Sequence, residues 1–119
     1  MPDALCVIST KAPFAGQSAR EALDSALVAA SYDIPTSILL MGDGVYQLLK
    51  QQQPEHIPRK NLSSMFQALS LYGIETVYVD QLSLSERNLN QDDLQVPVSL
   101  LSQEQISPFL QQHPKVLSF

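Results

Sequence analysis

The sequence predicts an α/β fold: a single small doubly wound domain of about five mostly parallel strands with helices on both faces. Short apolar runs of strand length alternate along the chain with amphipathic segments of helical period. The resulting order is strand, helix, strand, two helices, strand, helix, strand, helix, strand, and parallel neighbours need such crossovers. A length of 119 residues suits one compact domain, so we expect a single domain over residues 1–119.

The first part of the chain supplies two strands and a long helix. Residues 3–9, DALCVIS, form an apolar run rich in β-formers, which predicts a buried strand. Pro and Gly within residues 10–16 mark a loop. The segment 17–32 carries apolar residues three and four apart, which predicts a helix with a buried face of small side chains. Pro35 then precedes a second apolar run, 36–41, which predicts a second buried strand.

Two helices are expected between the second and third strands. The turn 42–44, GDG, makes a sharp exit, and Asp43 is a suitable N-cap for a short helix. A second helix over 62–72 has apolar residues at helical spacing and ends at Gly73, a natural left-handed stop. The β-formers of 74–79 predict the third strand.

The last third of the chain alternates helices with strands. The stretch 76–87, TVYVDQLSLSER, indicates the end of a strand that runs into a short helix. An apolar run at 96–101 predicts the fourth strand. Ser102 and Gln105 resemble a capping box for a further helix, and KVLSF closes the chain as a short strand. Pro108 falls inside that helix and is expected to distort it or delay its start.

Composition and charge narrow the class of protein. The net charge is -5 and the seven basic residues are scattered, so the surface lacks the basic patch that direct nucleic-acid binding needs. No apolar run is long enough to cross a bilayer, and the amino terminus lacks the basic start of a signal peptide. The single cysteine, Cys6, excludes an internal disulfide and a multi-cysteine metal cluster. We therefore expect a soluble cytoplasmic protein with no cofactor and no metal.

Chemistry in such a fold is expected at the carboxyl ends of the strands, where three polar residues are crevice candidates: Arg20, Asp43 and Asp80. Arg20 could bind a substrate, although a solvated helix start is the simpler interpretation. Asp43 belongs to a turn that lacks the third glycine and the lysine of nucleotide-binding motifs, so a capped turn is favoured. Asp80 could act as a general acid, but no partner is arranged for catalysis, and an N-cap role is favoured.

Three further residues could carry chemistry, and each has a simpler interpretation. Cys6 could be a sulfur or redox nucleophile, but its apolar strand favours a small core residue. His56 and His113 are far apart in the sequence and lack partners at metal-ligand spacing, which disfavours metal binding. A position near a helix C-terminus gives His113 a structural role there.

Four stretches form an ordered set: STKAPFAGQSAREALDSALVAA, MGDGVYQLL, ALSLYGIETVYVDQLSLSERNL and the terminal KVLSF. Together they resemble the DsrE/DsrF/DsrH-like sulfur-relay family, and in particular its TusC (DsrF-like) branch. Each motif alone is weak, but the set covers nearly the whole chain in register. The resemblance implies a small doubly wound α/β domain, which agrees with the predicted element order.

The resemblance also implies a function carried by a complex. Chains of this branch associate with a TusB-like and a TusD-like chain, and two such trimers form a heterohexamer with two of each. The complex receives persulfide sulfur and passes it on for 2-thiolation of the tRNA wobble uridine. In related sulfur oxidisers, the homologous complex serves dissimilatory sulfur metabolism.

In the register of this family, Asp80 stands where the TusD-like chain has its sulfur-carrying cysteine. A carboxylate cannot form a persulfide, and Cys6 lies inside a strand, so no catalytic residue carries over. The resemblance therefore implies a non-catalytic structural subunit, not an enzyme by itself. An enzyme or small-ligand binder that uses Asp80, Arg20 and the GDG turn stays open as an alternative, as do a sulfur-oxidation subunit and a homo-oligomeric relative.

A subunit of this kind should expose apolar side chains that the domain cannot bury alone. Tyr and Phe are typical of such surfaces. Each candidate could instead belong to the core, and for the two leucines the two interpretations have equal support. The candidates are Phe14, Val45, Tyr46, Leu82 and Leu84.

Overall fold

Five parallel strands form one sheet in the computed structural model, which describes residues 4–12, 16–49, 66–94 and 96–119. The strand order is β4-β3-β2-β1-β5, and every neighbouring pair is parallel. The predicted α/β class is therefore confirmed. The strands are β1 (Leu5–Ser9), β2 (Thr36–Leu40), β3 (Val77–Asp80), β4 (Val98–Leu101) and β5 (Lys115–Ser118).

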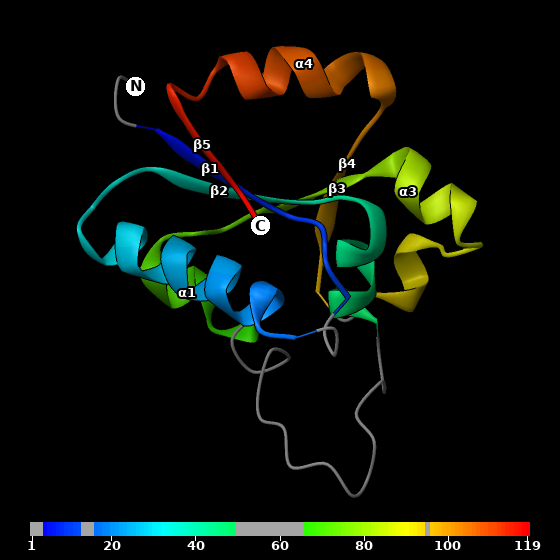
Figure 1. Ribbon diagram of the computed structural model, residues 1–119, viewed down its shortest axis with the longest axis horizontal. Helices are drawn as coiled ribbons and strands as arrows, with labels where there is room; N and C mark the ends of the chain where they lie inside the picture. The colour runs from blue at the N-terminus through cyan, green and yellow to red at the C-terminus, as the bar shows by residue number, and fades with distance from the viewer. Residues whose placement is uncertain (1–3, 13–15, 50–65, 95) are drawn as a thin grey trace, which may run out of the picture.

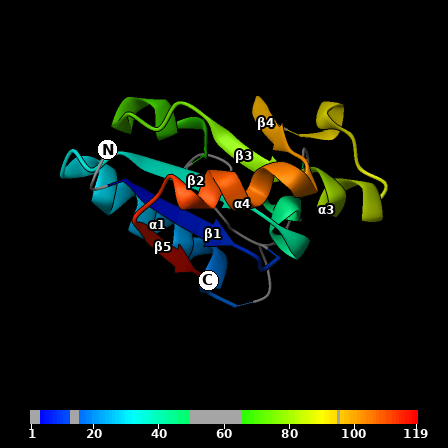
Figure 2. The same ribbon diagram turned by 90° about the horizontal axis from the view of Figure 1, so that it is seen from above.

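Helices lie on both faces of the sheet, as a parallel sheet requires. In Figure 1, α1 and η2 lie on one face and α4 lies on the other. Figure 2 shows α4 crossing the middle of the sheet. The helical elements are α1 (Ser18–Ser31), η1 (Gly42–Leu48), η2 (Leu69–Tyr72), α3 (Gln81–Glu86), η3 (Gln91–Asp93) and α4 (Gln103–Gln111), where η denotes a 3₁₀ helix.

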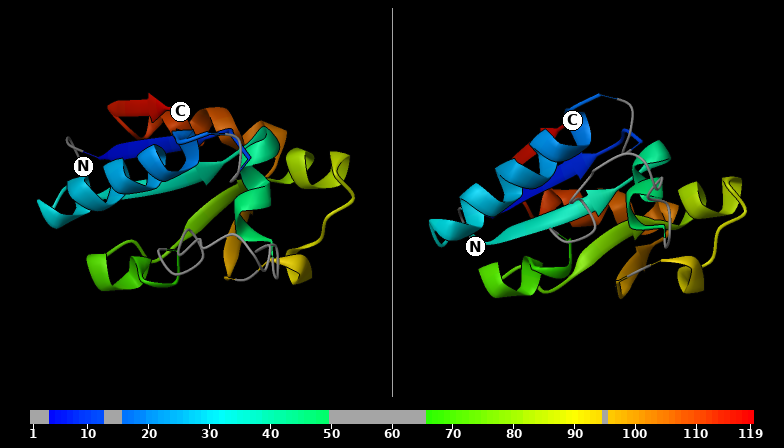
Figure 3. Two further views of the ribbon diagram at one scale, coloured as in Figure 1. Left: turned by 60° about the horizontal axis from the view of Figure 1, so that its bottom comes forward. Right: turned by 90° about the horizontal axis from the view of Figure 1, so that it is seen from below.

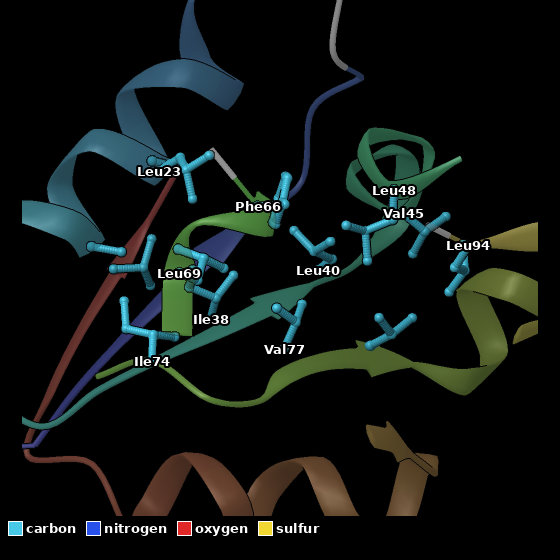
Figure 4. Close-up of a cluster of buried hydrophobic side chains, with 14 of the residues drawn as sticks. Leu23, Ile38, Leu40, Val45, Leu48, Phe66, Leu69, Ile74, Val77 and Leu94 are labelled. Atoms are coloured by element: carbon cyan, nitrogen blue, oxygen red, sulfur yellow. The ribbon is translucent and has the colours of Figure 1, made fainter. Parts of the chain in front are cut away.

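The main core lies between the sheet and α1, together with η1 and η2. The buried face of α1 consists mainly of alanines, so its backbone can approach the sheet closely. Figure 4 shows this cluster, in which Leu23 of α1 faces residues of β2 and η2. Its largest members include Leu23, Ile38, Leu40, Val45, Leu48, Phe66, Leu69, Ile74, Val77 and Leu94.

A smaller core lies under α4 on the opposite face. Cys6, Leu39 and Leu101 are its buried members. The rings of Tyr78 and Phe109 pack against each other with their centroids 4.5 Å apart. The short helix α4 therefore covers this face without a buried residue of its own.

The start of α4 agrees with the sequence. Ser102 and Gln105 form the predicted capping box, in which the Ser102 backbone N–H donates to Gln105 Oε1 over 2.9 Å. Pro108 lies inside the helix, which continues on both sides of it. The predicted delay of the helix start is wrong, because the capping box fixes that start at Ser102.

The predicted helix over 62–72 lies partly outside the described residues. Its described end is η2, which stops at Gly73 with a left-handed φ of 87°. The Gly73 backbone N–H donates to the carbonyl of Ser70 over 3.1 Å. The predicted glycine stop is therefore confirmed.

The turn after β2 differs from the prediction in its cap. η1 begins at Gly42, so Met41 holds the N-cap position and Asp43 lies inside the first turn without a capping bond. Gly44 sits against the end of β1, where an added Cβ would overlap the carbonyl oxygen of Ser9. The close approach of the two backbones therefore constrains this turn, and Asp43 does not cap it.

We predict that Gly44→Ala lowers the free energy of unfolding much more than Gly73→Ala. Ala at 73 meets no atom within 4 Å but must adopt a left-handed conformation, which costs about 1 kcal/mol. Ala at 44 must displace the backbone of β1, which costs about 3 kcal/mol or more. Urea unfolding followed by circular dichroism measures both, and equal losses would contradict the close approach at Gly44.

Candidate functional site

The exits of β2 and β3 lie side by side at the carboxyl edge of the sheet. The two strands pair in parallel, with Leu40 opposite Val79. η1 follows β2, α3 follows β3, and these two helices are in contact. In Figure 1 both lie at the same end of the sheet. Two of the three predicted crevice residues, Asp43 and Asp80, belong to this edge.

A chain of two hydrogen bonds joins these exits. The backbone N–H of Gly42 donates to Ser83 Oγ over 2.8 Å. Ser83 Oγ in turn donates to Asp80 Oδ2 over 2.6 Å. Ser83 and Asp80 are both buried, so these two hydrogen bonds are shielded from water. Hydrogen bonds are electrostatically stronger in the protein interior than in water. The hydroxyl of Ser83 therefore connects the turn after β2 to the end of β3.

Asp80 occupies the N-cap position of α3 with an extended backbone, but its side chain makes no capping bond. The predicted side-chain cap is therefore wrong, because the carboxylate accepts the Ser83 hydroxyl instead. Its other oxygen, Oδ1, is buried and has no hydrogen-bond partner in the described part of the chain. Asp80 is only 4% exposed. A carboxylate held in this way is poorly placed to exchange protons with a substrate.

Arg87 reinforces the same edge from outside. Its Nη2 and Nε donate to Asp43 Oδ1 over 2.9 and 3.2 Å, and its Nη1 donates to the carbonyl of Ser83 over 3.1 Å. Its guanidinium also lies 5.9 Å from the ring centroid of Tyr46. Sequence reasoning gave Arg87 no role. Its place near the end of α3, facing the turn after β2, emerges only from the parallel pairing of β2 with β3.

Gln47 joins the third exit, that of β1, to the same group. It is buried, and its Nε2 donates to Ser9 Oγ over 2.8 Å and to the carbonyl of Lys11 over 2.9 Å. Sequence reasoning missed this residue as well. The available signal was a lone amide among apolar residues in VYQLL. Polar side chains of η1 and α3 therefore fasten all three exits together.

Arg20 does not join this group. It lies on the exposed side of α1, where its Nε is 3.8 Å from Asp24 Oδ2, one helical turn away. Asp43 is exposed and paired with Arg87, and only Asp80 is buried. The three crevice candidates thus do not converge on one site among the described contacts. An enzyme built from Asp80, Arg20 and the GDG turn has no geometric support in them.

The predicted interface residues differ in their burial. Val45 and Leu84 are buried in the main core, so their interpretation as exposed interface groups is wrong. η1 turns Val45 inward, and α3 packs Leu84 against the end of the sheet. Leu82 is 42% exposed and Tyr46 is half-buried beside Arg87. Phe14 lies outside the described residues.

Several exposed apolar side chains were missed by sequence reasoning. They sit on helices and on an edge strand, away from the strand exits on which that reasoning concentrated. The large ones, besides Leu82, are Val28, Tyr32, Leu71, Tyr72, Val116 and Leu117.

The cysteine and histidine candidates have structural surroundings. Cys6 is fully buried, and burial raises the pKa of its thiol to about 11, so the thiol stays protonated at neutral pH. His113 Nδ1 donates to the carbonyl of Phe109 at the end of α4, and its Nε2 lies 3.1 Å from Ser37 Oγ. These contacts agree with the structural role expected for His113. His56 lies outside the described residues.

Residues 4–12, 16–49, 66–94 and 96–119 contain neither a candidate metal site nor a candidate membrane-spanning helix. No three His, Cys, Asp or Glu side chains in these ranges come close enough together to hold a metal ion. Within the same ranges, no helix has the length and apolar character to cross a membrane.

Comparisons with known proteins point to one family. A family model described as DsrE/DsrF-like matches residues 3–119. A "Protein TusC homolog" from Pseudomonas aeruginosa is 37% identical over 118 residues, covering 99% of this chain and 99% of that protein. A protein of the same name from Vibrio parahaemolyticus is 40% identical over 115 residues, covering 97% and 98%.

A second name occurs among the relatives. The "Intracellular sulfur oxidation protein DsrF" of Allochromatium vinosum is 40% identical over 87 residues, covering 73% of this chain and 64% of that protein. The crystal structure of the YchN protein from E. coli matches with a TM-score of 0.83 over 100% of both chains. At 20% identity that structure supports the fold alone.

We predict that Ser83→Ala destabilises the chain by roughly 2–4 kcal/mol, because it leaves a buried carboxylate and a backbone N–H without partners. The matched control is Ser85→Ala, an exposed serine on the same helix, which should change stability by no more than about 0.5 kcal/mol. Denaturant unfolding compares the two. If Ser83→Ala is as mild as its control, the hydrogen-bond chain does not hold the edge together.

Proposed function

The chain belongs to the DsrE/DsrF-like family, and on this premise we propose that it is a non-catalytic structural subunit of a hetero-oligomeric sulfur-relay complex of the TusBCD type. Its role there is to support the 2-thiolation of the tRNA wobble uridine. The partners in this proposal are a TusB-like and a TusD-like chain, two copies of each subunit per heterohexamer, in the cytoplasm.

The observation that carries the proposal is the buried hydrogen bond from Ser83 to Asp80. A sulfur carrier needs a polarisable thiolate that a donor protein can reach. At the exit of β3 this chain has Asp80, which is 4% exposed and whose carboxylate accepts a hydrogen bond from Ser83 of α3. The carboxylate at this position supports the architecture of the edge and offers no thiolate to receive sulfur.

Cys6 does not fill the missing role. It lies in β1, with β2 on one side and β5 on the other. Its thiol is fully buried with a pKa raised to about 11, so a donor protein meets neither an accessible sulfur nor a thiolate. Sulfur transfer by the complex must then use a cysteine on another chain.

A sulfur-oxidation subunit is the second candidate function. The similarity to the DsrF protein of Allochromatium vinosum favours it specifically, at 40% identity over 87 residues. Both candidates use the same non-catalytic role within a complex, and they differ in the protein that receives the sulfur. Relatives matched along nearly their whole lengths carry the name TusC homolog, which is why tRNA thiolation is the first choice.

We predict that Asp80→Asn leaves both assembly and wobble-uridine thiolation intact. The amide is isosteric with the carboxylate, and its oxygen can still accept the Ser83 hydroxyl. The measurement is the 2-thiouridine content of tRNA from a strain that carries only the variant, together with co-purification of the TusB-like and TusD-like chains.

The control for this assay is a serine in place of the sulfur-carrying cysteine of the TusD-like chain, which should abolish thiolation. Loss of thiolation in Asp80→Asn with the complex still assembled would contradict a non-catalytic role and would favour an acid–base function of Asp80. Normal thiolation in a strain lacking this chain would contradict the tRNA role itself.

A further inference from the structure

Four large apolar side chains are exposed on α1 and η2, and we call them the α1–η2 patch. Val28 lies on α1, and Tyr32 follows one turn later as the C-cap residue of that helix; they are 56% and 76% exposed. Leu71 and Tyr72 lie in η2 and are 84% and 46% exposed. A single exposed apolar side chain is ordinary, but apolar side chains that gather on two elements in contact are typical of an interaction surface.

The topology places the two halves of the patch together. α1 leads into β2 and η2 leads towards β3, and these strands are neighbours in the sheet. Both helices therefore end at the amino edge of adjacent strands. Figures 1 and 3 show both elements on the same face of the sheet, and α1 contacts η2 directly.

The patch is not a side effect of core packing. α1 already buries an alanine-rich face and Leu23 against the sheet, and η2 buries Leu69 beside them. Val28, Tyr32 and Leu71 do not belong to that core, and more than half of the surface of each stays exposed in this chain alone. Tyrosine and leucine side chains in such positions supply large contact areas to protein interfaces, and tyrosine is typical of their energetic centres.

Acidic residues border the patch. Asp24 precedes Val28 by one turn of α1, Asp33 follows Tyr32 directly, and Glu75 lies three residues after Tyr72. All three are exposed. Among the described basic residues, Arg20 is nearest in sequence to Asp24 and Asp33 and already faces Asp24, and Arg87, the nearest to Glu75, is paired with Asp43. A second copy docked through the same patch would place acids against acids, which disfavours self-association.

We propose that the α1–η2 patch is the docking surface for a different protein chain, one that presents an apolar centre bordered by lysine and arginine. This inference rests on the proposed function, because the partner is then another subunit of the relay complex. The patch lies at the amino edge of β2 and β3, opposite the edge that Asp80 and Ser83 close. Docking here leaves the carboxyl edge of this chain uncovered.

The test compares two exposed leucines. Leu71→Ala removes a patch residue, and Leu82→Ala makes the same change on α3 at the carboxyl edge, the surface that the sequence predicted. Affinity for the purified TusB-like and TusD-like chains is measured by calorimetry. Leu71→Ala should weaken binding roughly tenfold or more, and Leu82→Ala should leave it unchanged. Equal losses, or a loss in Leu82→Ala alone, overturn the proposal.

The charge border is tested by salt. The Asp33→Asn, Glu75→Gln double variant should bind less tightly at low ionic strength and should lose most of the salt dependence that the unmodified chain shows. If the affinity of the unmodified chain does not change with salt concentration, the proposed border of lysine and arginine on the partner is wrong.

The outcomes separate this proposal from the proposed function. If the unmodified chain binds neither partner chain, the proposed function fails, and this inference fails with it. If it binds and Leu71→Ala binds equally well, only the docking surface is wrong. Sedimentation of the chain alone tests whether the patch instead binds a second copy of this chain. A homodimer that Leu71→Ala dissociates would overturn the proposal in favour of that second copy.

Discussion

The hydroxyl of Ser83 makes the contact on which the carboxyl edge of the sheet depends. It accepts the backbone N–H of Gly42 and donates to Asp80, so one buried side chain joins the exits of β2 and β3. Gln47 fastens the exit of β1 to the same turn. In a parallel sheet these exits usually form the functional crevice. Here they are tied together by buried polar contacts, which leaves Asp80 enclosed.

The two edges of the sheet therefore differ in character. At the carboxyl edge, polar side chains satisfy one another within the chain, and Arg87 covers the turn from outside. Near the amino edge, Tyr32 and Leu71 are exposed on a surface bordered by acids. In the proposed role of a structural subunit, the carboxyl edge would supply the rigid frame and the α1–η2 patch the contact surface. Neither of these two regions needs a sulfur-carrying cysteine for that role.

Much of the fold was predictable because its signals are local. Alternating apolar runs, the Ser102 capping box and the Gly73 stop each depend on a few neighbouring residues. The site was less predictable because its contacts join residues about 40 positions apart. The sequence shows Asp80 as a cap, and only the pairing of β2 with β3 brings Gly42 to Ser83. Likewise, which side of η1 faces the core follows from its packing, and this turned Val45 from an interface candidate into a core residue.

The central claim is that sulfur passes through the complex without residing on this chain. The most direct measurement is intact-protein mass spectrometry of each subunit after the assembled complex has been incubated with a persulfide donor. The account predicts an added sulfur atom on the TusD-like chain and none on this chain, because its only thiol is buried and protonated. A stable added sulfur on Cys6 would contradict the account.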